Sequence, residues 1–313
     1  MIEKVPLLID TDPGCDDALA LMLAIRSNRF DIKAITTVAG NTTIEKTTRN
    51  AQYLLKLLQK EEIPVYSGAS KPLSRELILA EVHGDEGLGE IIPEIPYSLT
   101  QNAPERIVSL VESFPEIILI ALGPLTNIAA AIRLNSEIMK KVKKLVIMGG
   151  AINVEGNKNR VAEFNMFIDP EAAEIVLNFS IKKVFVPLDV CNTAPLFPED
   201  LERINNPPLK ETLKKILWPY MDKLFERENG IKAALMYDPL TMYYLINPDA
   251  FTLKSYDLRI ETQGNLTRGM TVPERRIKML KENNVEVAMA VSAEAFKEDF
   301  IAILSEKTLS ETI

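Results

Sequence analysis

Four carboxylates lie within eight residues near the amino terminus, at Asp10, Asp12, Asp16 and Asp17. Their mutual repulsion would raise their pKa values and destabilise the fold unless something positive or hydrogen-bonding lay among them. No Lys or Arg occurs between residues 5 and 25. Carboxylate oxygens are the ligands that hard cations such as Ca²⁺ and Mg²⁺ select. The segment therefore predicts a site for such a cation.

A purely structural role is the alternative for part of this segment. The Asp-Pro-Gly sequence at residues 12–14 is typical of a turn, and Asp16 or Asp17 could cap a helix expected over residues 18–27. Asp10 and Asp12 are not needed for such a cap. Their presence favours the cation site over capping alone.

The single histidine, His83, limits the chemistry that the chain can perform. It excludes mechanisms that need two histidines, including zinc sites of the His-Glu-x-x-His kind. Acid and base chemistry must then rest mainly on carboxylates, tyrosines or metal-bound water.

Bulk composition narrows the class of protein. The chain has 313 residues, 47% of them hydrophobic, and a net charge of −8, which argues against non-specific nucleic-acid binding. Cys15 and Cys191 lie far apart without a metal-ligand spacing, as suits a reducing cytoplasm. Residues 1–6 show no signal-type segment, and no apolar run approaches the length of a membrane span. We therefore expect a cytoplasmic protein with no nucleic-acid or membrane partner.

Short apolar runs alternate with amphipathic stretches along the chain. The predicted strands cover residues 6–9, 32–38, 117–121, 144–148 and 183–188, and the helices between them include 44–59, 103–113 and 171–178. This pattern predicts an α/β fold, with a mostly parallel, open, Rossmann-like sheet and helices on both faces. No linker or repeat interrupts it, so a single domain over residues 1–313 is expected.

Polar or small residues follow each predicted strand. Ligands of parallel sheets bind at the carboxyl ends of the strands, so these segments should meet at one active site. They are Asp10-Thr11-Asp12, Ala39-Gly40-Asn41, and residues 123–127, 149–151 and 189–192.

Several motifs in one order resemble a known family. They are Asp10-x-Asp12-Pro-Gly-x-Asp16-Asp17, Val38-Ala-Gly-Asn41, His83-Gly84-x-x-Gly87-Leu88, Gly123-Pro-Leu-Thr-Asn127, Met148-Gly-Gly-Ala151 and Ala162-Glu163-Phe164-Asn165-x-x-x-Asp169-Pro170-Glu171-Ala172. With them the chain resembles the calcium-dependent nucleoside hydrolases of the inosine-uridine type, from Asp10 to about residue 270.

The resemblance implies a metal centre and a base. Ca²⁺ would be held by Asp12, Asp17, Asp238 and the backbone carbonyl of Leu122, which suits a cation that takes six to eight oxygen ligands. Asp12 would also act as general base, taking a proton from the water that attacks the anomeric carbon. Cleavage of the N-glycosidic bond would pass through an oxocarbenium-like sugar.

The resemblance also implies the substrate contacts and the assembly. His83 would contact the nucleobase, and a homodimer or homotetramer is expected. The remaining residues would hold or shape the ribose site: Asp16, Asn41, Met148, Asn157, Glu163, Phe164 and Asn165.

Two positions depart from the family pattern. Many members carry His before the late Asp-Pro motif, where it can protonate the leaving base, whereas this chain has Tyr237. A tyrosine with a pKa of about 10 is a poorer proton donor near neutrality, although it can donate a hydrogen bond. Asn229 stands near the place where some pyrimidine-preferring members have tyrosine. Because His83 is present rather than a tryptophan, we predict a pyrimidine-leaning or broad base preference.

Two other functions compete with hydrolysis of ribonucleosides. A catalytically weak nucleoside- or ribose-binding protein would use the same contacts, with Tyr237 as the sign of lost catalysis. A Mg²⁺-dependent phosphatase of the haloacid dehalogenase type shares the Asp-x-Asp sequence at Asp10 and Asp12. That class expects Thr or Val where Gly14 stands, which disfavours it.

Overall fold

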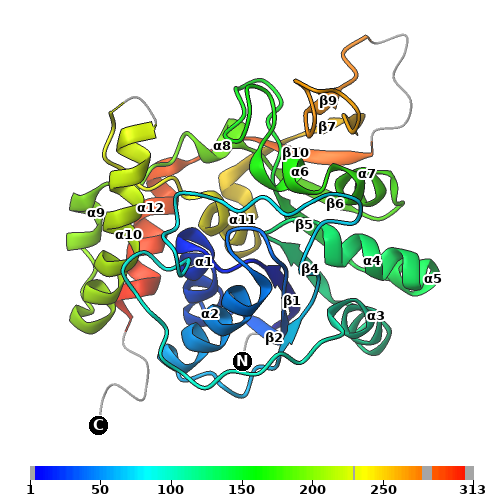
Figure 1. Cartoon of the computed structure of the whole chain (residues 1–313). Helices are drawn as coiled ribbons and strands as arrows, with labels where there is room; N and C mark the ends of the chain where they lie inside the picture. Colours follow the sequence, from blue (N-terminus) through cyan, green and yellow to red (C-terminus); the bar gives the residue numbers. More distant parts are fainter. Residues whose placement is uncertain (1–3, 228–229, 277–283, 307–313) are drawn as a thin grey trace.

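One sheet of eight strands organises the protein (Figure 1). The computed structural model describes residues 4–227, 230–276 and 284–306. In spatial order the strands are β3 (Val65–Ser67), β2 (Phe30–Thr37), β1 (Val5–Thr11), β4 (Ile118–Ala121), β5 (Lys144–Met148), β6 (Lys183–Val186), β10 (Val285–Val291) and β7 (Phe251–Tyr256). All neighbouring pairs are parallel except β10 with β7. The predicted single α/β domain with a mostly parallel sheet is confirmed.

The five predicted strands form the middle of this sheet. Strands β1, β4 and β6 are almost wholly buried, because helices cover both faces and leave little room for polar residues. Strand β2 begins at Phe30, before the predicted start, and β6 ends at Val186, before the predicted end. The strands that sequence patterns did not predict, β3, β10 and β7, lie at or near the two edges.

Helices pack on both faces of the sheet. On β1, Leu7 and Ile9 contact one hydrophobic cluster and Leu8 contacts the other, as expected for alternating side chains. The first cluster includes residues of α1 (Cys15–Arg26), α2 (Ile44–Leu57), α10 (Pro207–Arg227), α11 (Tyr237–Ile246) and α12 (Ala293–Ser305). The second includes residues of α3 (Ala103–Ser113), α4 (Thr126–Leu134), α5 (Ser136–Met139) and α7 (Pro170–Asn178).

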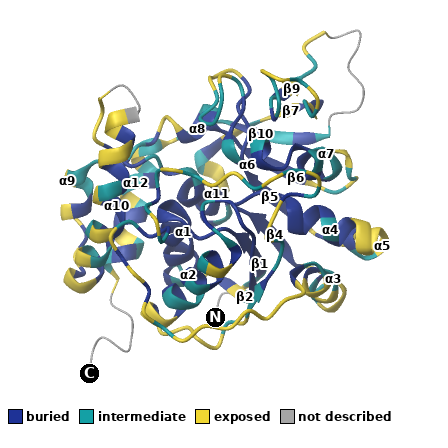
Figure 2. Ribbon diagram, in the orientation of Figure 1, coloured by how far each residue is buried: buried dark blue, intermediate teal, exposed yellow. Residues whose placement is uncertain are grey.

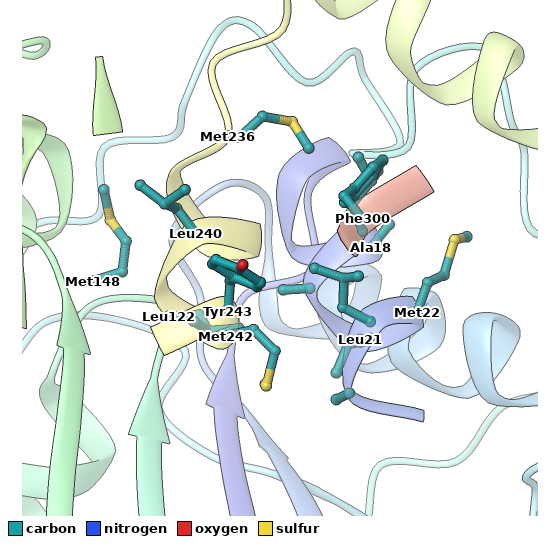
Figure 3. Packing of buried hydrophobic residues seen from close by; sticks show 14 of the residues in the cluster. Ala18, Leu21, Met22, Leu122, Met148, Met236, Leu240, Met242, Tyr243 and Phe300 are labelled. Atoms are coloured by element: carbon teal, nitrogen blue, oxygen red, sulfur yellow. The ribbon is translucent and has the colours of Figure 1, made fainter. Parts of the chain in front are cut away.

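Burial is concentrated in the sheet and on the inner sides of these helices (Figure 2). Figure 3 shows residues of α1, among them Leu21 and Met22, beside Tyr243 of α11 and Phe300 of α12. This packing fixes α1 and α11 relative to each other. Their amino-terminal ends therefore present Asp16, Asp17 and Asp238 from fixed positions.

Short elements complete the described structure. They are α6 (Phe164–Ile168), α8 (Leu188–Cys191), α9 (Pro198–Glu202), the 3-10 helix η1 (Pro248–Ala250), and a hairpin of β8 (Leu258–Ile260) and β9 (Thr271–Pro273). Within the described ranges, no helix combines the length and the apolar character needed to cross a membrane.

Candidate active site

A cavity of about 270 Å³ opens where the parallel strands end. Nearly all residues that the sequence predicted for the site line it, namely Asp16, Asn41, His83, Leu122, Met148, Asn157, Glu163, Phe164, Asn165, Tyr237 and Asp238. Asp12 and Asp17 do not line the cavity, but both contact Asn41, which does. Asn229 lies outside the described residues.

Three buried carboxylates form the cluster best placed to hold a cation. One oxygen from each of Asp16, Asp17 and Asp238 lies within 4.8 Å of the others. Asp16 and Asp17 come from the first turn of α1, and Asp238 comes from the first turn of α11. The family resemblance predicted Asp17 and Asp238 as metal ligands, in agreement with this cluster. It also predicted Asp12 as a ligand, and it assigned Asp16 to the ribose site instead.

Asp12 lies beside this cluster in a tightly fitted position. Its Oδ2 accepts a hydrogen bond from the backbone N–H of Asn41 at 2.7 Å. A Cβ atom on Gly40 would lie 2.2 Å from Oδ2, and one on Gly123 would lie 2.4 Å from Oδ1. Glycine is therefore required on both sides of this carboxylate, which accounts for the glycines of the motifs at residues 38–41 and 123–127.

Asp17 anchors the turn between β1 and α1. Its carboxylate accepts hydrogen bonds from the Thr11 hydroxyl, from the backbone N–H of Asp12 at 3.2 Å and of Gly14 at 2.9 Å, and from Asn41 Nδ2 at 2.9 Å. The capping alternative is thus confirmed for Asp17, which satisfies N–H groups at the start of α1. These four hydrogen bonds match the roughly four lone-pair positions of a carboxylate, so a cation at Asp17 would take the place of one of them or share its lone pair.

The electrostatics of the cluster favour a bound cation. Burial, and secondly repulsion by Asp17, raise the pKa values of Asp12, Asp16 and Asp238 well above their usual range. Oδ1 of Asp12 and Oδ1 of Asp16 are buried and accept no hydrogen bond within the described structure. Buried oxygens of this kind require a proton or a positive charge. The residues present therefore fit a metal ion, which the cluster could hold.

Asp10 belongs to the scaffold rather than to the cavity. Its Oδ1 accepts hydrogen bonds from Thr36 Oγ1 at 2.6 Å and from Asn127 Nδ2 at 2.8 Å, while Oδ2 has no partner within the described structure. Burial raises the pKa of Asp10 to about 7, even though both hydrogen bonds lower it. The folded protein therefore holds this proton at pH values where an unfolded chain would release it.

Asp10→Asn is expected to make the protein less sensitive to rising pH. Asn cannot titrate, it keeps one oxygen for Thr36 and Asn127, and its amide replaces the unpaired oxygen. The native chain loses stability as pH rises from about 4 toward 7, because only its unfolded state releases the proton. The variant should gain roughly 2 to 4 kcal/mol relative to it across this window. Denaturant unfolding in chelating buffer measures this, and a difference that is constant with pH would contradict it.

Another part of the cavity wall is formed by α6 and the residue that caps it. Glu163 caps this helix by accepting from the backbone N–H of Asn165 at 2.8 Å and of Met166 at 3.1 Å, and burial raises its pKa to about 7. Asn165 Nδ2 donates to the Leu122 carbonyl at 2.7 Å and lies 3.4 Å from Met148 Sδ. Amide, carboxyl and thioether groups thus line one side of the cavity together.

Asn157 also lines the cavity and makes a side-chain contact with α6. Its Oδ1 accepts from the backbone N–H of Phe164 at 2.8 Å, which connects the loop before α6 to the cavity. The ammonium group of Lys158 lies 5.7 Å from the centre of the Phe164 ring. Asn157, Lys158 and Phe164 all line the cavity.

His83 is held from two sides. Its Nδ1 accepts a hydrogen bond from the backbone N–H of Cys15 at 3.1 Å, and its ring stacks on Tyr220 with 5.4 Å between ring centres. Burial lowers the pKa of His83 to about 4, so the ring is neutral near pH 7. Because Nδ1 is an acceptor, the proton resides on Nε2. His83 is therefore a buried hydrogen-bond donor.

Tyr237 stands at the start of α11, directly before Asp238. It lines the cavity with His83 and Tyr220. Tyr220 of α10 and Tyr237 of α11 thus bring aromatic groups to the cavity beside His83, and Phe164 of α6 brings another.

Sequence patterns missed several lining residues. They are Ala80, Glu81, Val82, Lys158, Tyr220 and Leu224. Tyr220 and Leu224 are four residues apart on α10, so they share one helical face, and this spacing could have identified them. The others directly precede His83 or follow Asn157, and no feature of their own marks them.

These features define a class of protein: an α/β protein with an acidic cavity at the carboxyl ends of its strands, in which a cluster of carboxylates could hold a cation. Residues 7–298 match the family model described as inosine-uridine preferring nucleoside hydrolase. A pyrimidine-specific ribonucleoside hydrolase of Escherichia coli is 40% identical over 311 residues, covering 97% of this chain and 98% of that protein. The corresponding protein of Salmonella agona is 38% identical over 310 residues, with coverage of 97% and 98%.

Solved structures agree with the sequence matches. A plant nucleoside hydrolase has a TM-score of 0.91 and 32% identity, covering 97% of this chain and all of that chain. A purine-preferring ribonucleoside hydrolase from Gardnerella vaginalis has a TM-score of 0.89 and 26% identity, covering 96% and 98%. The chain belongs to the family of inosine-uridine preferring nucleoside hydrolases. It is an N-glycosidase that acts on ribonucleosides, and the phosphatase alternative is set aside.

Proposed function

We propose that this protein hydrolyses pyrimidine ribonucleosides to ribose and free base with the help of Ca²⁺. The observation that carries the proposal is the set of buried carboxylates Asp16, Asp17 and Asp238 beside Asp12, with unpaired oxygens on Asp12 and Asp16. Cytidine and uridine are favoured as substrates because the relatives that are 38–40% identical are named pyrimidine-specific. The purine-preferring protein shares only 26% identity.

The metal would be held by Asp12, Asp17, Asp238 and the carbonyl of Leu122. That carbonyl already accepts from Asn165, and its second lone pair is available to a cation. When bound, Ca²⁺ supplies a positive charge that acidifies water and holds ribose hydroxyls. Ca²⁺ is proposed over Mg²⁺ because it accepts a larger and less regular set of oxygens.

The residues of the chain perform the remaining steps. Asp12 takes a proton from the water that attacks the anomeric carbon, since its Oδ1 is unpaired and its Oδ2 is fixed by Asn41. Asp16, Asn41, Asn157, Glu163 and Asn165 hold the ribose hydroxyls, and Met148 and Phe164 shape the ribose site. These acidic and amide groups stabilise the oxocarbenium-like sugar as positive charge develops on it.

Departure of the base is assigned to His83 and Tyr237. The Nε2–H of His83 donates to an acceptor on the nucleobase, because Nδ1 is occupied by Cys15. Tyr237 donates a second hydrogen bond and takes the place that His has in many members of the family. Hydrogen bonding to the leaving base lowers the basicity that must be overcome when the N-glycosidic bond breaks.

The domain organisation, the assembly and the compartment of the protein are also part of the proposal. We propose that residues 1–313 act as one domain, assembled as a homodimer or homotetramer, as the family resemblance implies. Cys15 and Cys191 are both free and buried, which supports a reducing cytoplasm as the compartment.

Release of free ribose tests the proposal directly. Cytidine and uridine should be cleaved faster than inosine, adenosine and guanosine, in the absence of phosphate. Equal or faster cleavage of purine nucleosides would contradict the base preference. Binding of ribonucleosides without ribose release would instead support the catalytically weak binding protein.

2′-Deoxyuridine is expected to be a much poorer substrate than uridine, by at least about 100-fold in kcat/KM. Without the 2′-hydroxyl, buried polar groups of the ribose site are left unpaired. The comparison needs only the native protein and the two nucleosides. Similar rates for both would show that the buried amides and carboxylates do not read the ribose.

A further inference from the structure

A proline in the interior of α10 has a consequence for the neighbouring loop. Pro219 lies within α10, in which each N–H normally donates to the carbonyl four residues earlier. Proline has no N–H, so the carbonyl of Lys215 loses the hydrogen bond that this position would otherwise donate. Such a proline is unfavourable in a helix interior unless the freed carbonyl finds another donor.

The freed carbonyl is occupied by a segment far away in sequence. The backbone N–H of Glu90 donates to the Lys215 carbonyl at 3.0 Å. Glu90 ends the stretch that begins at His83, which we call the 83–90 loop. In Figure 1 the long connection between β3 and α3, which contains this loop, passes beside α10.

Gly89 allows this close approach. Its φ is +63°, and a Cβ atom there would lie 2.4 Å from the carbonyl oxygen of Ile216 and 2.6 Å from that of Lys215. Both atoms belong to a helix backbone and cannot move aside easily. A side chain at position 89 would therefore push the 83–90 loop away from α10.

A hydrogen bond joins the two ends of the 83–90 loop, and further contacts hold His83 on α10. The backbone N–H of Gly89 donates to the carbonyl of His83 at 3.0 Å, next to the bond made by Glu90. Tyr220, which follows Pro219 directly, stacks on the His83 ring at an interplanar angle of 15°. Lys223 Nζ adds a hydrogen bond to the carbonyl of Glu81 at 3.0 Å.

We propose that Pro219 is a positioning residue for nucleobase recognition, because it provides the carbonyl that holds the 83–90 loop on α10 and thereby fixes His83. The inference rests on the proposed function, in which His83 meets the nucleobase. Cys15 fixes the ring from the side of α1, and the contact with α10 fixes the loop from the other side. Both are needed to aim Nε2 into the cavity.

Pro219→Ala tests the role of the proline. The alanine introduced at this position would have an N–H that donates to the Lys215 carbonyl, which would compete with the Glu90 N–H and draw the carbonyl toward the helix axis, so the bond from Glu90 would weaken. We expect kcat/KM for uridine to fall by about tenfold, because a contact group is displaced. With 4-nitrophenyl β-D-ribofuranoside, whose leaving group departs without such help, the loss should stay below about twofold. The melting temperature should not fall, because a helix-breaking residue has been removed.

Pro208→Ala is the matched control, because Pro208 lies in the first turn of α10, where a missing N–H leaves no helical bond unmade. It should leave both substrates unaffected. Gly89→Ala disrupts the same contact from the side of the loop, because the added methyl group would push the loop away from α10. It should reproduce the selective loss of activity on uridine and should also lower the stability of the protein. An unchanged rate on uridine in Pro219→Ala, or equal losses on both substrates, would overturn the proposal.

Hydrogen exchange at the Glu90 amide tests the contact with the Lys215 carbonyl without any measurement of enzyme activity. Its exchange should accelerate by at least about tenfold in Pro219→Ala and stay native-like in Pro208→Ala. If the native protein released no ribose from any nucleoside, the proposed function would fail, and this amide would still report on the contact. A Glu90 amide that remains protected in Pro219→Ala would overturn the positioning role by itself.

Discussion

Asp12→Asn is expected to lower kcat for uridine by about 10²–10⁴-fold, the range that general acid–base groups contribute. The unpaired Oδ1 of Asp12 is the group proposed to take the proton of the attacking water. Asn is nearly the same size and can still accept the hydrogen bond from Asn41, so the fold should persist. The loss therefore reports on the missing base, together with a weakened metal ligand.

Asp31→Asn is a suitable control for this substitution. Asp31 lies on β2 with a side chain that is 51% exposed, and it pairs with Lys33. Removal of its charge should leave kcat unchanged. The role of Asp12 would be refuted by a folded Asp12→Asn variant that turns over uridine at a near-native rate.

Removal of Ca²⁺ is expected to abolish ribose release and to destabilise the fold. Without a cation, Asp12, Asp16, Asp17 and Asp238 crowd buried oxygens together with no positive partner. Restoring Ca²⁺ to about 100 times its Kd should stabilise the folded state by about 2.7 kcal/mol. This should raise the melting temperature by several degrees for a chain of this size.

The Asp238→Asn variant distinguishes stabilisation by a bound metal from a general effect of salt on the melting temperature. It removes one charge from the cluster while leaving α1 and its cap at Asp17 in place. The variant should need far more Ca²⁺ to gain the same melting temperature. A melting temperature that ignores Ca²⁺ in the native protein would show that the cluster holds no cation.

The central strands could be predicted because their environment is simple. Residues of β1, β4 and β5 are buried by helices on both faces, so each reads as a continuous apolar run. Strand β7 is buried only at its two ends, and its middle residues are exposed or half-buried. It therefore shows neither a continuous apolar run nor a regular alternation of apolar and polar residues. Its antiparallel pairing with β10 depends on long-range contacts that no local signal encodes.

Some residues of the candidate site could be predicted from their own motif, and others only from the family resemblance. The first motif contains Asp12, Asp16 and Asp17 on one turn, so its chemistry is visible in sequence. Asp238 joins them only because α11 packs against α1, and the family resemblance was needed to single it out. The capping of α1 by Asp17 is a structural role of the same carboxylate that we propose as a metal ligand.

The base end of the cavity was the least predictable part. The burial of His83 arises from Tyr220 and Cys15, which lie far from it in sequence. Pro219 would suggest a helix end from sequence alone, yet α10 continues past it to Arg227. The Glu90 amide that satisfies the freed carbonyl comes from a loop without regular structure, so no periodicity could have revealed it.

The most direct test of the central claim is the rate of ribose release from uridine by protein stripped of metal, before and after Ca²⁺ is restored. We expect no measurable release from the stripped protein and full, saturable recovery with Ca²⁺. The carboxylate cluster would then be the metal site that hydrolysis requires. Undiminished release of ribose in the stripped protein would contradict the account, because Asp12 and its neighbours would then be acting without a cation.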